Sequence, residues 1–177
     1  MKAIVLGMGL QGKAVIHDLE QSVMINRIFA ADINLGDAGA YLDRMGYSKT
    51  EMVKLDVSDE KDLAGRYAKM GVDVVICMLP IEHALTAARA AIDAGIPFVS
   101  SNYTYQLQEL DAIAKKRGVI ILPEMGLDPG IDLVLGRLAV DELDEVYGLY
   151  SYGGGVPALE CADDNPIHYK ISWIFDR

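Results

Sequence analysis

The stretch VLGMGLQGKAV, residues 5–15, carries glycines in the pattern G-x-G-x-x-G, between an apolar run and an amphipathic helical pattern. In such a strand–turn–helix unit, Gly7 permits the tight turn and Gly9 lets the backbone approach a pyrophosphate. Gly12 lets the helix pack closely, and the N–H groups at the helix start face the phosphates. The stretch predicts a dinucleotide-binding turn. The alternative is a glycine-rich turn in another kind of α/β protein.

Asp32 stands twenty residues after the last of these glycines, at the end of the next apolar run. A carboxylate at this place accepts hydrogen bonds from the adenine ribose hydroxyls and repels the 2′-phosphate of NADP. An NADP site usually has an arginine just after this position, whereas this chain has Ile33 and Asn34. The sequence therefore favours NAD. NADP stays an alternative, because Arg44 or Lys49 would supply a cation if either one folded over the pocket.

Short apolar runs recur along the chain and alternate with helical patterns. The runs are AIVL at 3–6, RIFAAD at 27–32, MVKLDV at 52–57, VDVVICML at 72–79, PFVS at 97–100 and GVIIL at 118–122. Strands that alternate with single helices form βαβ units, and these make a parallel sheet with helices on both sides. We predict an α/β fold, with a doubly wound (Rossmann) domain over residues 1–145 and the start of a second α/β domain over residues 146–177.

The helical segments between these runs show start and stop signals. The first segment places small and apolar residues on one face, at Gly12, Val15, Ile16, Leu19 and Val23. Gly95 and Gly118 each follow a helical pattern, where a left-handed C-cap is common. Asp128-Pro129 has the form of an N-cap and first helical residue, opening a helix to about Glu142. After that helix, residues 146–152 predict a further strand.

In a doubly wound sheet the ligand lies at the carboxyl edge of the strands. Residues 78–80 would line the nicotinamide side, although Pro80 is equally suited to start a helix. Asp56 and its neighbour Val57 would lie near the adenine; the alternative for Asp56 is a loop carboxylate or a helix cap. Residues 101–103 offer polar groups that loop polarity explains almost as well. The expected cofactor contacts are Gly7, Gly9, Leu10, Gln11, Gly12, Asp32, Ile33, Asp56, Val57, Met78, Leu79, Pro80, Ser101, Asn102 and Tyr103.

Composition narrows the partners. The net charge of −10 disfavours nucleic acid, whose binding needs Lys and Arg, and disfavours an anionic membrane surface. The apolar runs are too short to span a bilayer, and the N-terminus lacks the layout of a signal peptide.

With only Cys77 and Cys161, a disulfide framework is not expected, and a reducing, cytoplasmic setting is favoured; Cys77 is expected in the core. His17, His83 and His168 lack metal-ligand spacing, so we expect no metal and solvent-facing or packing roles for them.

Motifs in the second half of the chain carry a resemblance. G-L-D-P-G-I-D lies in residues 124–138, and G-G-x-P-A and D-N-P-x-x-Y-K-x-S-W lie in residues 151–177. Together with the N-terminal G-x-G-x-x-G, and in this order, they make the chain resemble the saccharopine dehydrogenase family over essentially its whole length. This family includes saccharopine reductases, lysine 6-dehydrogenases and carboxynorspermidine dehydrogenases. The resemblance implies a nicotinamide-dependent oxidoreductase that forms or oxidises a carbon–nitrogen bond in an amino-acid substrate.

The resemblance also implies a larger whole, because family members are about twice this length and insert a substrate domain after the Rossmann part. Residues 165–177 then become the entry strand into that domain, and the chain a truncated form or the product of a split gene, inactive by itself. We expect the open strand edge to be paired in a homodimer or disordered. The resemblance assigns Asp128 to proton handling or amine binding, and Tyr169 and Lys170 to the substrate end. Lys170 would be a general base or a cation for a substrate carboxylate; the alternative is an exposed strand lysine.

Two departures from the family pattern leave the substrate open. Fungal saccharopine reductases typically have a cysteine before the paired glycines, where this chain has Tyr152. They also use NADP, whereas Asp32 resembles the NAD-using lysine 6-dehydrogenase branch, which in turn usually lacks the aspartate of G-L-D-P-G. One alternative is a dehydrogenase for another small amino or carbonyl substrate, such as lysine or carboxynorspermidine. Another is a non-catalytic NAD-binding regulatory or interaction module.

Overall fold

The computed structural model describes residues 1–59, 61–155, 157–166, 168 and 169. The chain divides into two compact units, Met1–Ile131 and Asp132–Arg177. The domain boundary that the sequence suggested, between residues 145 and 146, stays a prediction. Among the described residues, no helix is both long enough and apolar enough to cross a membrane.

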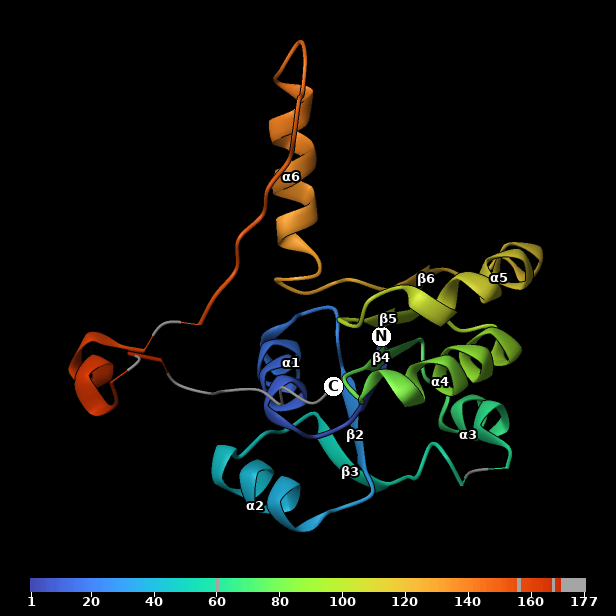
Figure 1. Cartoon of the computed structure of the whole chain (residues 1–177). Helices are drawn as coiled ribbons and strands as arrows, with labels where there is room; N and C mark the ends of the chain where they lie inside the picture. The colour runs from blue at the N-terminus through green and yellow to red at the C-terminus, as the bar shows by residue number, and fades with distance from the viewer. Residues whose placement is uncertain (60, 156, 167, 170–177) are drawn as a thin grey trace. The chain divides into compact units, whose positions relative to one another are not determined.

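The first unit contains a six-stranded parallel sheet (Figure 1). Its strands are β1 (Lys2–Leu6), β2 (Arg27–Asp32), β3 (Thr50–Lys54), β4 (Val74–Cys77), β5 (Phe98–Ser100) and β6 (Ile121–Leu122). The strand order is β3-β2-β1-β4-β5-β6, with every neighbouring pair parallel. This order confirms the predicted doubly wound α/β fold, and it places the reversal of strand order between β1 and β4.

Helices cover both faces of the sheet. They are α1 (Leu10–Gln21), α2 (Gly36–Met45), α3 (Leu63–Met70), α4 (Ile81–Ala94) and α5 (Asp111–Arg117), with a 3₁₀ helix η1 (Tyr105–Leu110) before α5. Alternate strand residues enter two cores: Ala3 and Val5 pack with α1 and α2, whereas Ile4 and Leu6 pack with α3, α4 and α5. Because both faces are buried, the central strands are continuous apolar runs in the sequence.

Most of the helix signals are confirmed. Gly95 and Gly118 are left-handed C-caps of α4 and α5, with φ of 72° and 65°. The buried face of α1 holds Gly12 and Ile16, but Val23 is 100% exposed. The prediction for Val23 was wrong, because α1 ends at Gln21 and the chain turns away in an extended conformation at the next residue.

The start of α6 (Ile131–Asp141) differs from the prediction. Asp128 is not its N-cap, because Gly130 has a φ of 149°, which is not helical. Residues 126–130 form a compact turn instead, with a cis Asp128-Pro129 peptide bond. Gly126 N donates to Pro129 O at 3.0 Å, and Ile131 N donates to Gly126 O at 3.0 Å. The G-L-D-P-G motif therefore encodes a turn that precedes the helix.

The second unit differs from the expected pattern as well. Residues 146–152 are not a strand, although their composition favours one. A strand needs a hydrogen-bonding neighbour, and the described residues of this unit include no strand to pair with. A 3₁₀ helix, η2 (Leu159–Asp164), follows. The strand predicted over residues 165–177 lies largely outside the described residues.

Candidate functional site

A cavity of about 630 Å³ opens at the carboxyl edge of the sheet in the first unit. This volume falls within the range typical of small-molecule sites. Most of the predicted cofactor contacts line it, but Leu10, Gly12, Ser101 and Tyr103 do not. The lining residues are Leu6, Gly7, Gly9, Gln11, Ala31, Asp32, Ile33, Leu55, Asp56, Val57, Ser58, Met78, Leu79, Pro80, His83 and Asn102.

The glycine turn between β1 and α1 has the geometry that its spacing predicted. Gly7 has a φ of 92°, and a Cβ at Gly12 would lie 1.9 Å from Gly7 O, so no side chain fits there. A Cβ at Gly9 would have no atom within 4 Å, which leaves its backbone open to a ligand. Gly9 is also the N-cap of α1, without a side-chain cap and without an acidic residue in the first turn. Leu10 begins the helix and is 81% exposed. The helix start is therefore suited to an anion.

Asp32 is the last residue of β2 and lines the cavity. Met8 N donates to its Oδ2 at 2.7 Å, and Asn34 N donates to its Oδ1 at 2.8 Å. Two backbone donors thus fix the orientation of the carboxylate next to the glycine turn. A negative charge is built into the wall of the cavity.

The two cations that would favour NADP lie elsewhere. The Arg44 guanidinium sits over the Tyr41 ring, 5.8 Å from its centroid. The Lys49 ammonium donates to Glu20 O at 2.6 Å and to Ser22 O at 2.9 Å. Lys49 precedes β3, so it lies at the amino edge of the sheet, opposite the cavity. Neither cation lines the cavity.

Asp56 lies two residues beyond the end of β3 and lines the cavity beside Val57. Its Oδ1 accepts a hydrogen bond from Ser58 N at 2.9 Å, which closes a local turn. It does not cap a helix, because Asp62 is the N-cap of α3 and accepts from Gly65 N. The structure thus rules out the helix cap and shows a loop carboxylate in the cavity wall, whereas the place of Asp56 near the adenine stays a prediction.

Ser58 and His83 are cavity residues that the sequence did not reveal. Ser58 Oγ and His83 Nδ1 lie 3.0 Å apart, within hydrogen-bonding distance. His83 belongs to the first turn of α4, where His83 N donates to Pro80 O at 3.0 Å. Neither residue belongs to a motif, and the two are 25 positions apart, so only the packing of α4 brings them together. The prediction that His83 faces solvent or only packs missed its place in the cavity wall.

The loops after β4 and β5 are tied to each other and to the glycine turn. Asn102 Nδ2 donates to Leu79 O at 3.0 Å, and Ser101 Oγ donates to Gln11 Oε1 at 3.1 Å. Pro80 is the residue before α4 and also lines the cavity, whereas its place beside a nicotinamide stays a prediction. These bonds fix the end of the cavity that is formed by the loops after β4 and β5, around Met78, Leu79 and Asn102. This end is called the far end, because β3 lies on the other side of the sheet.

The turn after β6 brings Asp128 to the loop after β5. Tyr103 OH donates to Asp128 Oδ1 at 3.0 Å, and the Tyr103 and Tyr105 rings lie 5.4 Å apart between centroids. Glu124 anchors this arrangement, because its Oε1 accepts from Thr104 N at 2.9 Å and from Thr104 Oγ1 at 2.7 Å. Tyr103 and Asp128 therefore form a polar pair just outside the cavity lining.

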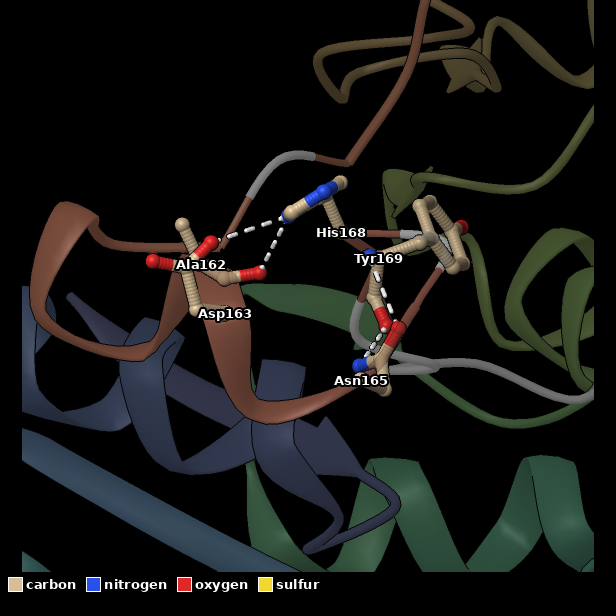
Figure 2. Close-up of polar contacts among 5 residues, drawn as sticks. All are labelled: Ala162, Asp163, Asn165, His168 and Tyr169. Carbon is tan, nitrogen blue, oxygen red and sulfur yellow. Dashed lines mark hydrogen bonds and ion pairs between the residues drawn. The ribbon is translucent and has the colours of Figure 1, made fainter.

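The residues assigned to the substrate end belong to the second unit. Asn165 Nδ2 donates to Tyr169 O at 2.8 Å, and His168 faces Ala162 O and Asp163, as Figure 2 shows. Asn165 thus shapes a local turn. Lys170 lies outside the described residues, so its role stays a prediction, as does that of Tyr169.

Two further features concern cysteine and metal chemistry. Cys77 is fully buried at the end of β4, and burial raises the pKa of its thiol to about 11, as suits a core residue. Among the described residues, no group of three or more His, Cys, Asp or Glu side chains is placed to hold a metal ion.

The parallel sheet, its strand reversal and the glycine turn define an NAD(P)-binding Rossmann domain of the dehydrogenase superfamily. Residues 3–122 match the family model for the saccharopine dehydrogenase NADP binding domain. The chain belongs to the saccharopine dehydrogenase family.

Relatives and a solved structure agree with this assignment. The chain is 34% identical over 175 residues to saccharopine dehydrogenase [NADP(+), L-glutamate-forming] of Saccharomyces cerevisiae, covering 96% of this chain and 38% of the relative. It is 35% identical over 133 residues to the Pyricularia oryzae enzyme of the same name, covering 72% of this chain and 29% of the relative. The structure of apo saccharopine dehydrogenase (L-Glu forming) from S. cerevisiae matches with a TM-score of 0.82 at 33% identity, over 97% of this chain and 38% of that one. The chain thus spans well under half the length of these relatives.

Proposed function

We propose that the chain is the NAD-preferring cofactor-binding part of an oxidoreductase that acts on the carbon–nitrogen bond of an amino-acid substrate. The observation that carries the proposal is the fixed Asp32 carboxylate in the wall of a cavity that the glycine turn also lines. The substrate class follows from the relatives, whose names specify saccharopine as substrate and L-glutamate as product.

The preference for NAD rests on charge. In the proposed complex Asp32 accepts hydrogen bonds from the ribose hydroxyls of NAD, whereas the 2′-phosphate of NADP would meet a carboxylate. The relatives' names specify NADP(+), so this chain departs from them in the proposal. Two observations support a preference for NAD. Arg44 lies over the Tyr41 ring and Lys49 donates to Glu20 O, so neither cation lines the cavity where a 2′-phosphate would need it.

The fit of a dinucleotide rests on three observations from the described residues. The start of α1 offers backbone donors for a pyrophosphate, Gly9 leaves room for its approach, and Asn102 lines the far end of the cavity. The bound nicotinamide would accept or supply the hydride. The chain's own part is to orient the dinucleotide and to present a proton-handling group.

We assign that last role to Asp128, with Tyr103 as its hydrogen-bonding partner. An exposed carboxylate next to the loop that lines the nicotinamide end is suited to bind the substrate ammonium or to take a proton from it. The hydrogen bond from Tyr103 OH holds Asp128 in one orientation. Lys170 is proposed to serve the substrate carboxylate.

A chimera tests the proposed reaction. In it, this chain replaces the matching 38% of the S. cerevisiae enzyme, which supplies the rest of the protein. We expect oxidation of saccharopine with NAD⁺ as the oxidant, and a loss of about 10²-fold or more in turnover for Asp128→Asn. A chimera that binds NADH but oxidises no saccharopine would leave cofactor binding intact and refute the carbon–nitrogen activity.

A further inference from the structure

The Ser58–His83 hydrogen bond joins parts of the cavity that lie far apart in the sheet order. Ser58 follows β3, whereas His83 lies in the first turn of α4, directly after β4. β2 and β1 lie between these two strands in the sheet. The bond therefore ties together loops from the two sides of the strand reversal, where a dinucleotide is expected to cross.

One nitrogen of the His83 ring is left for a ligand. Nδ1 is held by Ser58 Oγ at 3.0 Å, and His83 is a lining residue of the cavity. Within the part of the chain that the structure describes, no hydrogen bond to Nε2 is present. Because the ring is tied down through one nitrogen, its orientation is set before a ligand arrives, which lowers the entropic cost of using the other.

The surroundings of His83 suit a purine. Ile33, Leu55 and Val57 line the same cavity and offer apolar surface for the faces of the base. Asp56 adds a carboxylate that can accept from an exocyclic amine. The acceptor nitrogens of the adenine ring need a hydrogen-bond donor, and a histidine N–H is such a donor. Carboxylate and imidazole together match the mixed donor and acceptor rim of adenine.

We propose that His83, oriented by Ser58, is a purine-contacting residue of the cofactor site. Ser58 O–H donates to Nδ1, which places the ring proton on Nε2, and Nε2–H donates to a ring nitrogen of adenine. This inference rests on the proposed dinucleotide site and deepens it, since it adds a side chain that recognises the base.

Two amide variants distinguish contact of His83 with the base from a purely structural role of the Ser58–His83 hydrogen bond. Asn at position 83 can place its amide oxygen near the site of Nδ1, where it accepts from Ser58 O–H, but it has no group at the place of Nε2. Gln is one carbon longer and can bring an N–H donor to that place. Binding of AMP, which contains the base, and of nicotinamide mononucleotide, which lacks it, is measured by competition against NADH. His17→Ala is the matched control, because His17 bonds to Tyr47 and does not line the cavity.

We expect His83→Asn to weaken AMP about 3- to 10-fold, the loss of one hydrogen bond, and His83→Gln to stay within about threefold of the unaltered chain. Affinity for nicotinamide mononucleotide should not change in either variant. Unchanged AMP binding in His83→Asn, or an equal loss for both nucleotides, would overturn the inference. If the unaltered chain binds neither NADH nor NADPH, the proposed function fails as well, so the two failures are distinguishable.

Discussion

Gly12 is the residue whose replacement the structure excludes most directly. A Cβ at this position would lie 1.9 Å from Gly7 O, a backbone atom that cannot move without opening the turn. We expect Gly12→Ala to lower the free energy of unfolding by about 1–3 kcal/mol, as overpacking does. NADH affinity should fall as well, because the turn that faces the pyrophosphate has to shift. Urea unfolding and an NADH titration measure the two effects.

The control for this variant is Gly39→Ala. Gly39 lies inside α2, and a Cβ there would have no atom within 4 Å. Replacing a helix-interior glycine by alanine should raise the free energy of unfolding by about 0.5–1 kcal/mol. If both variants shifted stability in the same direction, the close approach at Gly12 would not be the cause.

How well single residues were predicted depended on sequence distance. Gly7, Gly9 and Asp32 follow from a local fingerprint, since their spacing within one βαβ unit fixes their geometry. Ser58 and His83 could not be found in this way, because their meeting depends on how α4 lies against the loop after β3. Tertiary packing of that kind leaves no signal in local spacing.

At the scale of elements, α3 and β4 carry an unusual pair of buried groups. Tyr67 and Cys77 are fully buried, and Tyr67 OH has no hydrogen-bond partner among the described residues. Burial, and then the nearby Cys77, raises the pKa of Tyr67; burial raises the pKa of Cys77 from 9.0 to about 11. Both groups thus stay protonated in the folded chain at a pH where the unfolded chain has lost those protons.

The sign of the pH effect follows from these raised pKa values. Above pH 9 the unfolded chain binds fewer protons than the folded one, so the free energy of unfolding should fall as the pH rises from 9 towards 11. Below pH 9 these two groups should have no effect. Chemical denaturation at a series of pH values, with Cys77→Ala for comparison, checks this; a flat profile in the unaltered chain would contradict it.

Tyr67→Phe tests the unpartnered hydroxyl itself. Removing a buried donor that makes no hydrogen bond should raise the free energy of unfolding by about 1 kcal/mol at neutral pH. Tyr41→Phe is the control, since Tyr41 OH donates to Lys13 O at 3.3 Å and lies 3.0 Å from Tyr47 OH; its loss should destabilise. A destabilised Tyr67→Phe would mean that the hydroxyl has a partner, such as a buried water.

Helices and strands could be predicted where the periodicity of hydrophobic residues, or a glycine at a helix end, indicates them. All six apolar runs became strands, and the C-caps at Gly95 and Gly118 are present. The turn around Asp128 was misread, because Gly130 sets a backbone conformation that an N-cap pattern does not reveal. Residues 146–152 have the composition of a strand but lack a neighbour among the described residues, and pairing is not encoded locally.

At the scale of the whole molecule, the cavity belongs to the first unit alone. Every lining residue lies between Leu6 and Asn102, within Met1–Ile131. We therefore expect a chain ending at Ile131 to fold and to bind NADH within about twofold of the full chain. Circular dichroism and calorimetry on chains ending at residues 131, 145 and 177 measure this. A cavity that needs residues 132–145 would show itself as a loss of binding in the shortest chain only.

The central claim is that the negative charge of Asp32 makes the cofactor site prefer NADH over NADPH. One comparison of dissociation constants tests it. The ratio of the Kd for NADPH to the Kd for NADH is measured in the unaltered chain and in Asp32→Asn, which removes the charge but keeps the shape. We predict a ratio above about 10 in the unaltered chain and a fall of about tenfold or more in the variant, as expected for two like charges at close range. A ratio near one in the unaltered chain, or one that Asp32→Asn leaves unchanged, would contradict the assignment of Asp32 to the cofactor ribose.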